Sequence, residues 1–276
     1  MTEDTIAAGA DRAPTAGQGQ EQGQEQGQEQ GQGAGAGVRP AAFIFDVFGT
    51  CVDWRAGVAA EVGRAVAAKG AACDPGQFAD AWRNAYDPAM APIRAGLRGY
   101  VALDDLHREN LETVLRAHDL GDALDGAERA ALARAWEKLP AWADVPTGLA
   151  RLKALGPVAP CSNGSIALMV HLARFAHLPW DCVLGAEIAE TYKPEAAVYL
   201  AACAALRLAP AQVMMIACHP DDLDAAATAG LRTGYVPRPR EWGEAASPSL
   251  ITLDEAEARF DLAGADFHAL ADALGG

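Results

Sequence analysis

The sequence predicts an α/β fold, a doubly wound parallel sheet with a helical cap domain inserted after its first strand. Three observations lead to this class. Short apolar runs such as Phe43 to Phe45 recur along the chain, and such runs are typical of strands buried on both faces of a sheet. From residue 150 onward these runs alternate with helical patterns, which predicts successive strand-helix units. Residues 75–139 carry helical patterns without a good strand, so they are predicted to belong to the cap.

The first 38 residues are predicted to be a disordered low-complexity tail. Residues 18–33 repeat Gly, Gln and Glu and contain almost nothing apolar. Such a segment cannot bury enough apolar surface to offset the entropy that is lost on folding. The rest of the chain is predicted to divide into an α/β core domain, residues 39–52 and 147–276, and a helical cap domain, residues 53–146.

The first predicted strand, residues 41–45, ends at Asp46. Gly49 then permits a tight turn, because glycine adopts backbone conformations that other residues avoid. Residues 56–69 are predicted to be a helix, since valines recur there at intervals of four and a glycine follows. Further helices of the cap are predicted at residues 78–85, 103–118 and 126–139.

Strands and helices alternate again in the second part of the core. A helix is predicted to end at residues 149–155, where the chain leaves the cap. The following strands are predicted at residues 158–161, 182–188, 213–218 and 233–236, and the helices at residues 166–175, 195–206 and 223–229, with helical patches over 254–274.

The composition narrows the class of partner. The chain has 276 residues and a net charge of −15, so a nucleic-acid partner is not expected, because phosphate binding needs clustered Lys and Arg. An apolar run of about 18 residues, the length of a membrane span, does not occur. The N-terminus lacks the basic region and apolar core of a secretory signal. We therefore expect a cytoplasmic protein that binds neither nucleic acid nor a membrane.

The cysteines support the same compartment. Their spacing matches neither a zinc motif nor a small disulfide framework. Several fall in predicted apolar strands, so they are predicted to be reduced, buried residues. The six are Cys51, Cys73, Cys161, Cys182, Cys203 and Cys218.

Polar residues follow four of the predicted strands. In open parallel sheets the carboxyl ends of the strands meet at one crevice, where ligands bind. Each residue taken alone has a simpler explanation: the acids and the serine are suited to capping a following helix, and the lysine to a solvated loop. All four positions together favour a site. They are Asp46, Ser162 with Asn163, Lys193 and Asp222.

Electrostatics supports this interpretation. If the fold brings Asp46 and Asp222 together, their charges repel and one carboxylate tends to protonate. A nearby Lys193 would keep both ionised. A carboxylate that is held charged and partly desolvated can act as a nucleophile.

The motifs in this order resemble those of the haloacid dehalogenase superfamily, over residues 41–272. They are Phe45 to Thr50, Ser162 to Gly164, Lys193-Pro194 and the region of Asp221-Asp222. The resemblance implies a Rossmann-like core with a cap. Most members of the superfamily are magnesium phosphatases with a second acid two residues after the first. Phe48 occupies that position here, and its ring can neither donate a proton nor bind a metal. The chain therefore resembles the type II, (S)-2-haloacid dehalogenase branch, which implies no metal and no cofactor.

The resemblance also implies a mechanism. Asp46 attacks C2 of a short 2-haloalkanoic acid from the side opposite the halogen, so that halide leaves and an aspartyl ester forms. Water then attacks the carboxyl carbon of Asp46 and releases a 2-hydroxy acid of inverted configuration. Arg83 matches the arginine that receives the halide.

The other site residues are carried over from the same family pattern. Those with a catalytic part, besides Asp46 and Arg83, are Thr50, bonded to the nucleophile, Lys193, which steadies it, and Asp222, which orients or activates water. Those expected at the substrate are Phe48, Ser162, Asn163, Tyr199 and His219. Ser162 and Asn163 match residues that hold the substrate carboxylate, and Tyr199 matches a tyrosine that steadies the neighbours of the nucleophile.

Three departures from the family pattern affect the expected substrate range. His219 stands where an asparagine would help to place water, Phe48 replaces a frequent tyrosine, and Asp221 replaces a bulky apolar residue. A tighter and more polar pocket would favour acids of two or three carbons, including fluorinated ones. The alternatives are a magnesium phosphatase that tolerates Phe48, a hydrolase acting at C2 of another small acid without halide release, and a non-catalytic binding module. A homodimer is expected from similar proteins.

Overall fold

The computed structural model describes residues 39–245 and 247–276, and the predicted tail, residues 1–38, lies outside this part. In the described part, six strands form one sheet in the order β3-β2-β1-β4-β5-β6, and each neighbouring pair is parallel. This confirms the predicted α/β class. The strands are β1 (Ala42–Phe45), β2 (Val158–Ser162), β3 (Leu184–Gly185), β4 (Val213–Ala217), β5 (Arg232–Tyr235) and β6 (Leu262–Ala263).

The first strand lies near the centre of the sheet, between β2 and β4. The chain moves outward from β1 to β2 and β3 and then returns to the other side of β1 at β4. The direction of winding therefore changes beside β1, and open parallel sheets bind ligands beyond the strand ends at such a point. Asp46 follows β1 directly and His219 lies two residues after β4, so both residues lie there.

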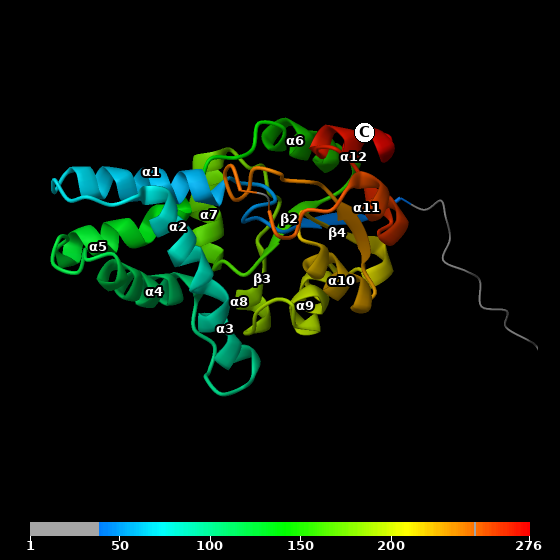
Figure 1. The fold of residues 1–276 in the computed structure, drawn as a ribbon. Coiled ribbons are helices and arrows are strands. Elements are labelled where there is room, and N and C mark those ends of the chain that lie inside the picture. The colour runs from blue at the N-terminus through cyan, green and yellow to red at the C-terminus, as the bar shows by residue number, and fades with distance from the viewer. Residues whose placement is uncertain (1–38, 246) are drawn as a thin grey trace, which may run out of the picture. The chain divides into compact units, whose positions relative to one another are not determined.

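Helices cover both faces of the sheet, since alternate residues of a strand point to opposite faces. Phe43 and Phe45 pack in one hydrophobic cluster and Ile44 in the other. The helices of this region are α6 (Val145–Leu155), α7 (Ile166–Ala176), α8 (Ala186–Ala189), α9 (Ala196–Leu206), α10 (Pro220–Thr228), α11 (Leu253–Arg259) and α12 (Phe267–Ala273). Helices α6 and α12 lie on one side of the sheet, and α9 and α10 on the other (Figure 1).

Between β1 and β2 the chain forms the helices predicted for the cap, which extend to one side of the sheet in Figure 1. They are α1 (Trp54–Ala67), α2 (Pro75–Asn84), α3 (Tyr86–Arg94), α4 (Leu103–Ala117), α5 (Gly126–Ala133) and a 3-10 turn, Arg134–Glu137. The prediction missed α3, because proline disfavours a helix interior and Pro92 lies inside this helix. The helix predicted over 126–139 ends earlier and continues as the 3-10 turn. The boundaries of the two domains stay predictions.

Two predictions at the edges of the sheet were wrong. Residues 182–188 were predicted to be one strand, but β3 has two residues and the chain continues as α8. Gly185 has a φ of +130°, and a Cβ atom there would lie 2.1 Å from the Ser162 carbonyl oxygen, so the chain bends where it meets β2. The prediction also missed β6, whose two residues are too few to produce a pattern.

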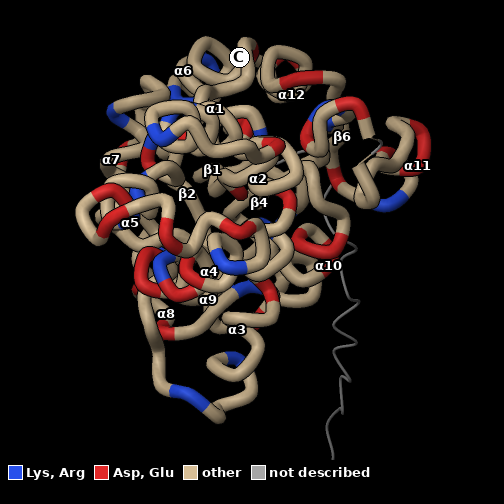
Figure 2. Tube along the Cα trace, turned by 60° about the vertical axis from the view of Figure 1, so that its left-hand side comes forward, with Lys and Arg blue, Asp and Glu red and all other residues tan. Residues whose placement is uncertain are grey.

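Charged residues of both signs lie along the described elements. Acidic residues occur along α4, α5, α10 and α11, and Lys and Arg are interspersed among the elements (Figure 2).

All six cysteines are free, as predicted, but Cys182 is exposed and Cys73 is half-buried. The prediction that all are buried was wrong for these two, because Cys182 precedes β3 and Cys73 lies in the turn before α2. In the described residues, no helix combines the length and the hydropathy that crossing a bilayer would need.

Candidate active site

The loop after β1 fixes Asp46 at the carboxyl end of a central strand. Gly49 has a φ of +89°, so the predicted tight turn is present and needs a glycine. Trp142 Nε1 donates to the Gly49 carbonyl at 2.8 Å. Arg238 Nε donates to the Thr50 carbonyl at 2.9 Å. Segments that are distant in the sequence thus hold the loop in place.

Two carboxylates flank one ammonium group at this end of the sheet. Lys193 Nζ donates to Asp46 Oδ1 at 2.8 Å and to Asp222 Oδ2 at 2.5 Å. Thr50 Oγ1 donates to Asp46 Oδ2 at 2.7 Å, and His219 Nδ1 lies 3.1 Å from the same oxygen. Asp46, Lys193 and Asp222 are each 7–8% exposed, so water screens their charges little. Side chains predicted at separate strand ends therefore meet at hydrogen-bonding distance.

These contacts set the charge of the nucleophile candidate. Burial by itself would raise the pKa of Asp46, but Lys193 and His219 hold it well below its ordinary value. Burial would likewise lower the pKa of Lys193, but the two carboxylates raise it well above its ordinary value. Burial raises the pKa of Asp222, and the nearby Asp46 charge raises it further, while Lys193 acts in the opposite direction. At neutral pH, Asp46 is thus the carboxylate most firmly held as an anion.

A cavity of about 320 Å³ opens beside Asp46. It lies between the strand ends and the helices that follow β1, because its lining comes from both regions. Seven of the ten predicted site residues line it, namely Asp46, Phe48, Arg83, Asn163, Lys193, His219 and Asp222. The other lining residues are Tyr86, Asp87, Met90, Pro194, Asp221, Glu241, Trp242, Pro248 and Ser249.

Arg83 brings a cation into this cavity from α2. Its guanidinium lies 4.4 Å from the ring centre of Tyr86 and 5.8 Å from that of Trp54, and its Nε is buried without a hydrogen-bond partner. Among the described residues, no carboxylate lies within ion-pair distance of it. A partly desolvated cation with no counter-ion among these residues attracts an anion that enters the cavity.

Thr50, Ser162 and Tyr199 do not belong to the cavity lining. Thr50 contacts Asp46 Oδ2 without lining the cavity itself. The Ser162 hydroxyl accepts from the Gly164 backbone N–H at 3.1 Å, and the Tyr199 hydroxyl donates to Asp222 Oδ1. In this structure these side chains support their neighbours, and the contact of Ser162 and Tyr199 with substrate stays a prediction.

Asn163 both supports a neighbouring residue and lines the cavity. Its Oδ1 accepts from the Lys193 backbone N–H at 2.8 Å, and the residue lines the cavity. Because Oδ1 is occupied in this way, the amide fixes the backbone from which the Lys193 side chain extends. Phe48 closes another part of the lining, and its ring packs edge-on against Trp136 at a centroid distance of 5.5 Å.

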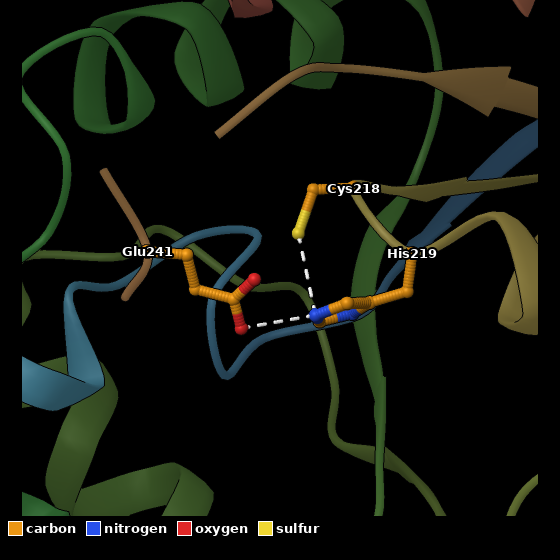
Figure 3. Close-up of side chains that lie close together, drawn as sticks. All are labelled: Cys218, His219 and Glu241. Carbon is orange, nitrogen blue, oxygen red and sulfur yellow. Dashed lines mark hydrogen bonds and ion pairs between the residues drawn. The ribbon is translucent and has the colours of Figure 1, made fainter. Parts of the chain in front are cut away.

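Sequence reasoning missed Glu241, which is 1% exposed and lines the same cavity. Its Oε1 lies 3.0 Å from His219 Nε2 (Figure 3). The feature of the sequence that could have indicated Glu241 is its position in the loop after a strand, β5, since other site residues also follow strands. Five residues separate it from the end of β5, and a sequence pattern does not determine the path of such a loop.

Cys218, His219 and Glu241 also have the residue types of a metal site, and one atom of each lies within 4.8 Å of the others. These atoms already contact one another, since His219 Nε2 lies 3.6 Å from Cys218 Sγ and 3.0 Å from Glu241 Oε1 (Figure 3). Burial raises the pKa of Cys218, which keeps the thiol protonated, whereas a metal binds the thiolate. We interpret the cluster as a hydrogen-bonded one.

Comparison with known proteins identifies relatives of this arrangement. Residues 40–230 match the family model described as a haloacid dehalogenase-like hydrolase. Among curated proteins, the (S)-2-haloacid dehalogenase 4A of Burkholderia cepacia is 28% identical over 203 residues, which cover 71% of this chain and 83% of that protein.

Two solved structures resemble the whole described fold. The defluorinating L-2-haloacid dehalogenase Rha0230 is 39% identical, with a TM-score of 0.82 over 86% of this chain and 96% of that one. The L-2-haloacid dehalogenase PA0810 is also 39% identical, with a TM-score of 0.78 over 85% and 99% of the two chains. The similarity therefore includes the helices between β1 and β2 as well as the sheet.

Proposed function

We propose that this chain, which belongs to the haloacid dehalogenase-like hydrolases, converts short 2-haloalkanoic acids to 2-hydroxy acids through an ester on Asp46. One observation carries the proposal: a carboxylate held as an anion lines the same small cavity as a cation that has no counter-ion in the described part of the chain. A displacement at carbon that releases halide needs this pair of charges. The two relatives of 39% identity are both named L-2-haloacid dehalogenases.

In the first step, a carboxylate oxygen of Asp46 attacks C2 of the haloacid, and the bond from carbon to halogen breaks. Lys193 and Thr50 hold the carboxylate, so that little reorganisation precedes the attack. The departing halide takes the bonding electron pair and meets the Arg83 guanidinium, which stabilises the charge that develops there. Asn163 lines the cavity where it can contact the carboxylate of the substrate.

In the second step, water attacks the carboxyl carbon of the Asp46 ester. The bond between that carbon and the substrate oxygen breaks, the 2-hydroxy acid leaves, and the carboxylate is restored. The oxygen that Asp46 donated stays with the product. Two residues lie close enough to Asp46 to act on this water. Asp222 shares the Lys193 ammonium group with Asp46, and His219 Nδ1 contacts Asp46 directly.

The arrangement around Phe48 argues against the magnesium phosphatase that the sequence left open. Phosphatases of this family need a second acid at this position, to protonate the leaving oxygen. The Phe48 ring instead packs against Trp136, in an aromatic cluster that continues to Trp54. Position 48 therefore offers no carboxylate to a leaving oxygen or to a metal. The absence of a cofactor stays a prediction.

The cavity also limits the substrate. Its volume of about 320 Å³ lies at the low end of the range of ligand pockets, roughly 300–1,000 Å³. We expect acids of two and three carbons to react faster than longer ones. Equal rates of halide release along a series from chloroacetate to 2-chlorohexanoate would contradict this, and fluoroacetate in the same series tests the smallest halogen.

The decisive experiment is a single turnover in water enriched in oxygen-18, with the enzyme in excess over 2-chloropropionate and with a chelator present. The proposal predicts one halide per substrate, heavy oxygen in Asp46, and ordinary oxygen in the lactate. Heavy oxygen in the lactate of this first turnover would exclude the ester route. Halide release that stops when the chelator is added would exclude the metal-independent reaction.

A cytoplasmic location and a homodimer stay predictions. Six free cysteines, four of them buried, support a reducing compartment. Sedimentation analysis of the full chain measures the oligomeric state, and an unchanged monomer at micromolar concentration would contradict the expected dimer.

A further inference from the structure

The chain passes twice between the sheet and the inserted helices, and the two passages lie side by side. The outgoing connection, residues 46–53, joins β1 to α1, and the return connection, residues 138–144, joins the 3-10 turn to α6. The Trp142 N–H donates to the Cys51 carbonyl at 3.1 Å, and a second hydrogen bond and an antiparallel bridge also join the two connections. Because they are bonded to each other, a change in the angle between the helices and the sheet distorts both connections.

Arg238, in the loop after β5, contacts both connections. Its Nε donates to the Thr50 carbonyl of the outgoing connection at 2.9 Å. Its two terminal nitrogens donate to the two carboxylate oxygens of Asp144, which ends the return connection, each at 2.9 Å. One planar group thus bonds to both connections, and its rigid shape fixes the distance between them.

The ion pair of Arg238 with Asp144 is largely buried. Arg238 is 8% exposed, and its guanidinium lies 5.2 Å from the ring centre of Phe267 and 5.8 Å from that of Trp142. Burial alone would raise the pKa of Asp144, but the hydrogen bonds and the charge of Arg238 hold it below its ordinary value. Asp144 is therefore ionised at neutral pH. Water competes little for such a pair, so the pair keeps its geometry better than an exposed one does.

The outgoing connection also holds the proposed nucleophile. Thr50 Oγ1 donates to Asp46 Oδ2 at 2.7 Å and accepts from the Cys218 N–H at 2.9 Å. The carbonyl of the same Thr50 is the acceptor of Arg238 Nε. A displacement of Thr50 therefore changes the direction in which the Asp46 carboxylate points.

The same connection determines where Arg83 lies. Helix α1 begins directly after residue 53 and packs against α2, which carries Arg83. Asp46 and Arg83 line one cavity from its two sides, and the two connections are the covalent links between these sides. The distance across the cavity therefore depends on how the connections are held.

We infer that Arg238 is a positioning residue, which sets the separation of Asp46 from Arg83 by holding the two connections together. The inference rests on the proposed function, because it concerns the geometry of the first step. Attack at C2 needs the carboxylate on one side of the carbon and the halide acceptor on the other. An error of about 1 Å in such an arrangement costs on the order of 10²-fold in rate. Hydrolysis of the ester does not need the halide acceptor, so it depends much less on this separation.

A single turnover of Arg238→Ala, with saturating enzyme over 2-chloropropionate and rapid quenching, tests this difference. Halide release measures ester formation, which is expected to slow by about 10- to 100-fold. Ester, detected by intact mass, should accumulate no more than in the wild type, because hydrolysis keeps its rate. A merely structural role would lower the fraction of active enzyme and leave the rate constant of ester formation unchanged. Halide release at the wild-type rate, or more ester than in the wild type, would overturn the inference.

Two further measurements test whether the planar guanidinium is needed. Added guanidinium ion at low concentration should restore ester formation in Arg238→Ala, because it can fill the space that the substitution leaves. Arg238→Lys keeps the charge, but one ammonium group cannot contact the Thr50 carbonyl and both oxygens of Asp144. Its rate should therefore lie between those of the wild type and Arg238→Ala. Full activity of Arg238→Lys, or no effect of guanidinium on Arg238→Ala, would overturn the inference.

Asp144→Asn tests the contact from its other side. Ester formation should slow in this variant too, and the double variant with Arg238→Ala should lose no more than Arg238→Ala alone, because the two residues act as one unit. Losses that multiply would overturn the inference. The matched control is Arg259→Ala, since this half-exposed arginine also pairs with an aspartate and lies 5.2 Å from a ring centre, that of Phe260. It should leave both steps unchanged.

Hydrogen exchange measures the connections directly. In Arg238→Ala, the backbone N–H groups of Asp53 and Trp142, which bond across the two connections, should exchange faster than in the wild type, while those of β1 stay protected. Unchanged exchange at both positions would overturn the inference.

The two proposals fail in different ways. If the wild-type enzyme releases no halide, the proposed function is wrong, whatever hydrogen exchange shows. If the wild-type enzyme releases halide and a folded Arg238→Ala variant does so at the same rate, the inference alone is wrong. Circular dichroism identifies a variant that does not fold. If Arg238→Ala is one, then Arg238→Lys and Asp144→Asn decide, and wild-type rates in both would overturn the inference.

Discussion

The two cations that line the cavity differ in whether a carboxylate contacts them. Lys193, on the sheet side, contacts two carboxylates at 2.8 and 2.5 Å. Arg83, on the side of the inserted helices, is surrounded by aromatic rings and has no carboxylate partner among the described residues. The difference fits the division of tasks that we propose for the reaction. On the sheet side the charges neutralise one another around the proposed nucleophile, and on the helical side one charge stays uncompensated for an anion that enters the cavity.

The same contrast extends to the other buried polar groups. On the sheet side, Glu241 and Asp222 each have hydrogen-bond partners on both carboxylate oxygens. On the helical side, both ring nitrogens of His107 and the indole nitrogen of Trp136 are buried without partners. Their rings are stacked at 4.2 Å, so this region is built as an apolar aromatic cluster around Arg83. The following changes test this comparison, from the largest expected effect to the smallest.

Replacing the nucleophile should remove the activity. Asp46→Asn keeps the shape of the side chain but cannot form the ester, so halide release should fall by about 10⁴-fold or more. The measurement is halide release over many turnovers. Asp254→Asn, an exposed acid of α11, is the control and should keep the wild-type rate. An Asp46→Asn enzyme of near wild-type rate would disprove the assignment of the nucleophile.

Removing the ammonium group should destabilise the fold. Lys193→Met leaves Asp46 and Asp222 buried without their shared partner, which is expected to lower the free energy of unfolding by about 3–5 kcal/mol at pH 7. Urea denaturation measures this. Lys153→Met breaks a half-exposed pair with Asp181 and should cost less than about 1 kcal/mol.

The same experiment on the other cation sharpens the contrast. Arg83→Met removes a charge that has no partner, so stability should be unchanged or higher. If Arg83→Met destabilised the protein as much as Lys193→Met, the two cations would not differ as described.

The activity of Arg83→Met should fall in one step only. Loss of the cation that receives the halide is expected to slow ester formation by about 10²- to 10³-fold, while hydrolysis of the ester keeps its rate. Rapid quenching with excess enzyme separates the two steps. Arg98→Met, an exposed arginine paired with Glu109 outside the cavity lining, is the control and should leave both steps unchanged. Slower hydrolysis with normal ester formation would contradict the role of Arg83.

His107 should make the protein sensitive to acid. Burial, with a further effect of Arg83, lowers the pKa of His107 to about 3, whereas the unfolded chain has an ordinary value near 6.5. Between these values the unfolded state binds more protons. Its contribution therefore lowers stability as the pH falls from about 6.5, by up to about 1.4 kcal/mol per pH unit, and has no effect above pH 7.

Urea denaturation at pH 5 and pH 7.5 measures this contribution. His107→Phe keeps a ring against Trp136 and should reduce the loss of stability at pH 5. His177→Phe, at the end of α7, is the control. An unchanged loss in His107→Phe would mean that other groups account for the acid sensitivity.

Much of the fold and of the sheet side of the site was predictable. Buried strands of a parallel sheet carry apolar runs, and the residue after such a run lies at the edge where ligands bind, so Asp46 was found from its position. Arg83 was found only through the resemblance of its motif. The two-residue edge strands were missed because they are too short to produce a periodic pattern. Helix α3 was missed because a proline inside it argues against a helix.

What the sequence determined by itself is the alternation of strands and helices in the core, the carboxylate after the first strand and the lack of an acid at position 48. Tertiary structure alone decided which oxygen each donor reaches, that no described residue is a counter-ion of Arg83, and that Glu241 contacts His219. The reason is physical. Periodicity and strand ends are local properties of the chain, whereas Glu241 meets Trp54 across 187 positions, and only the folded packing determines a contact of that separation.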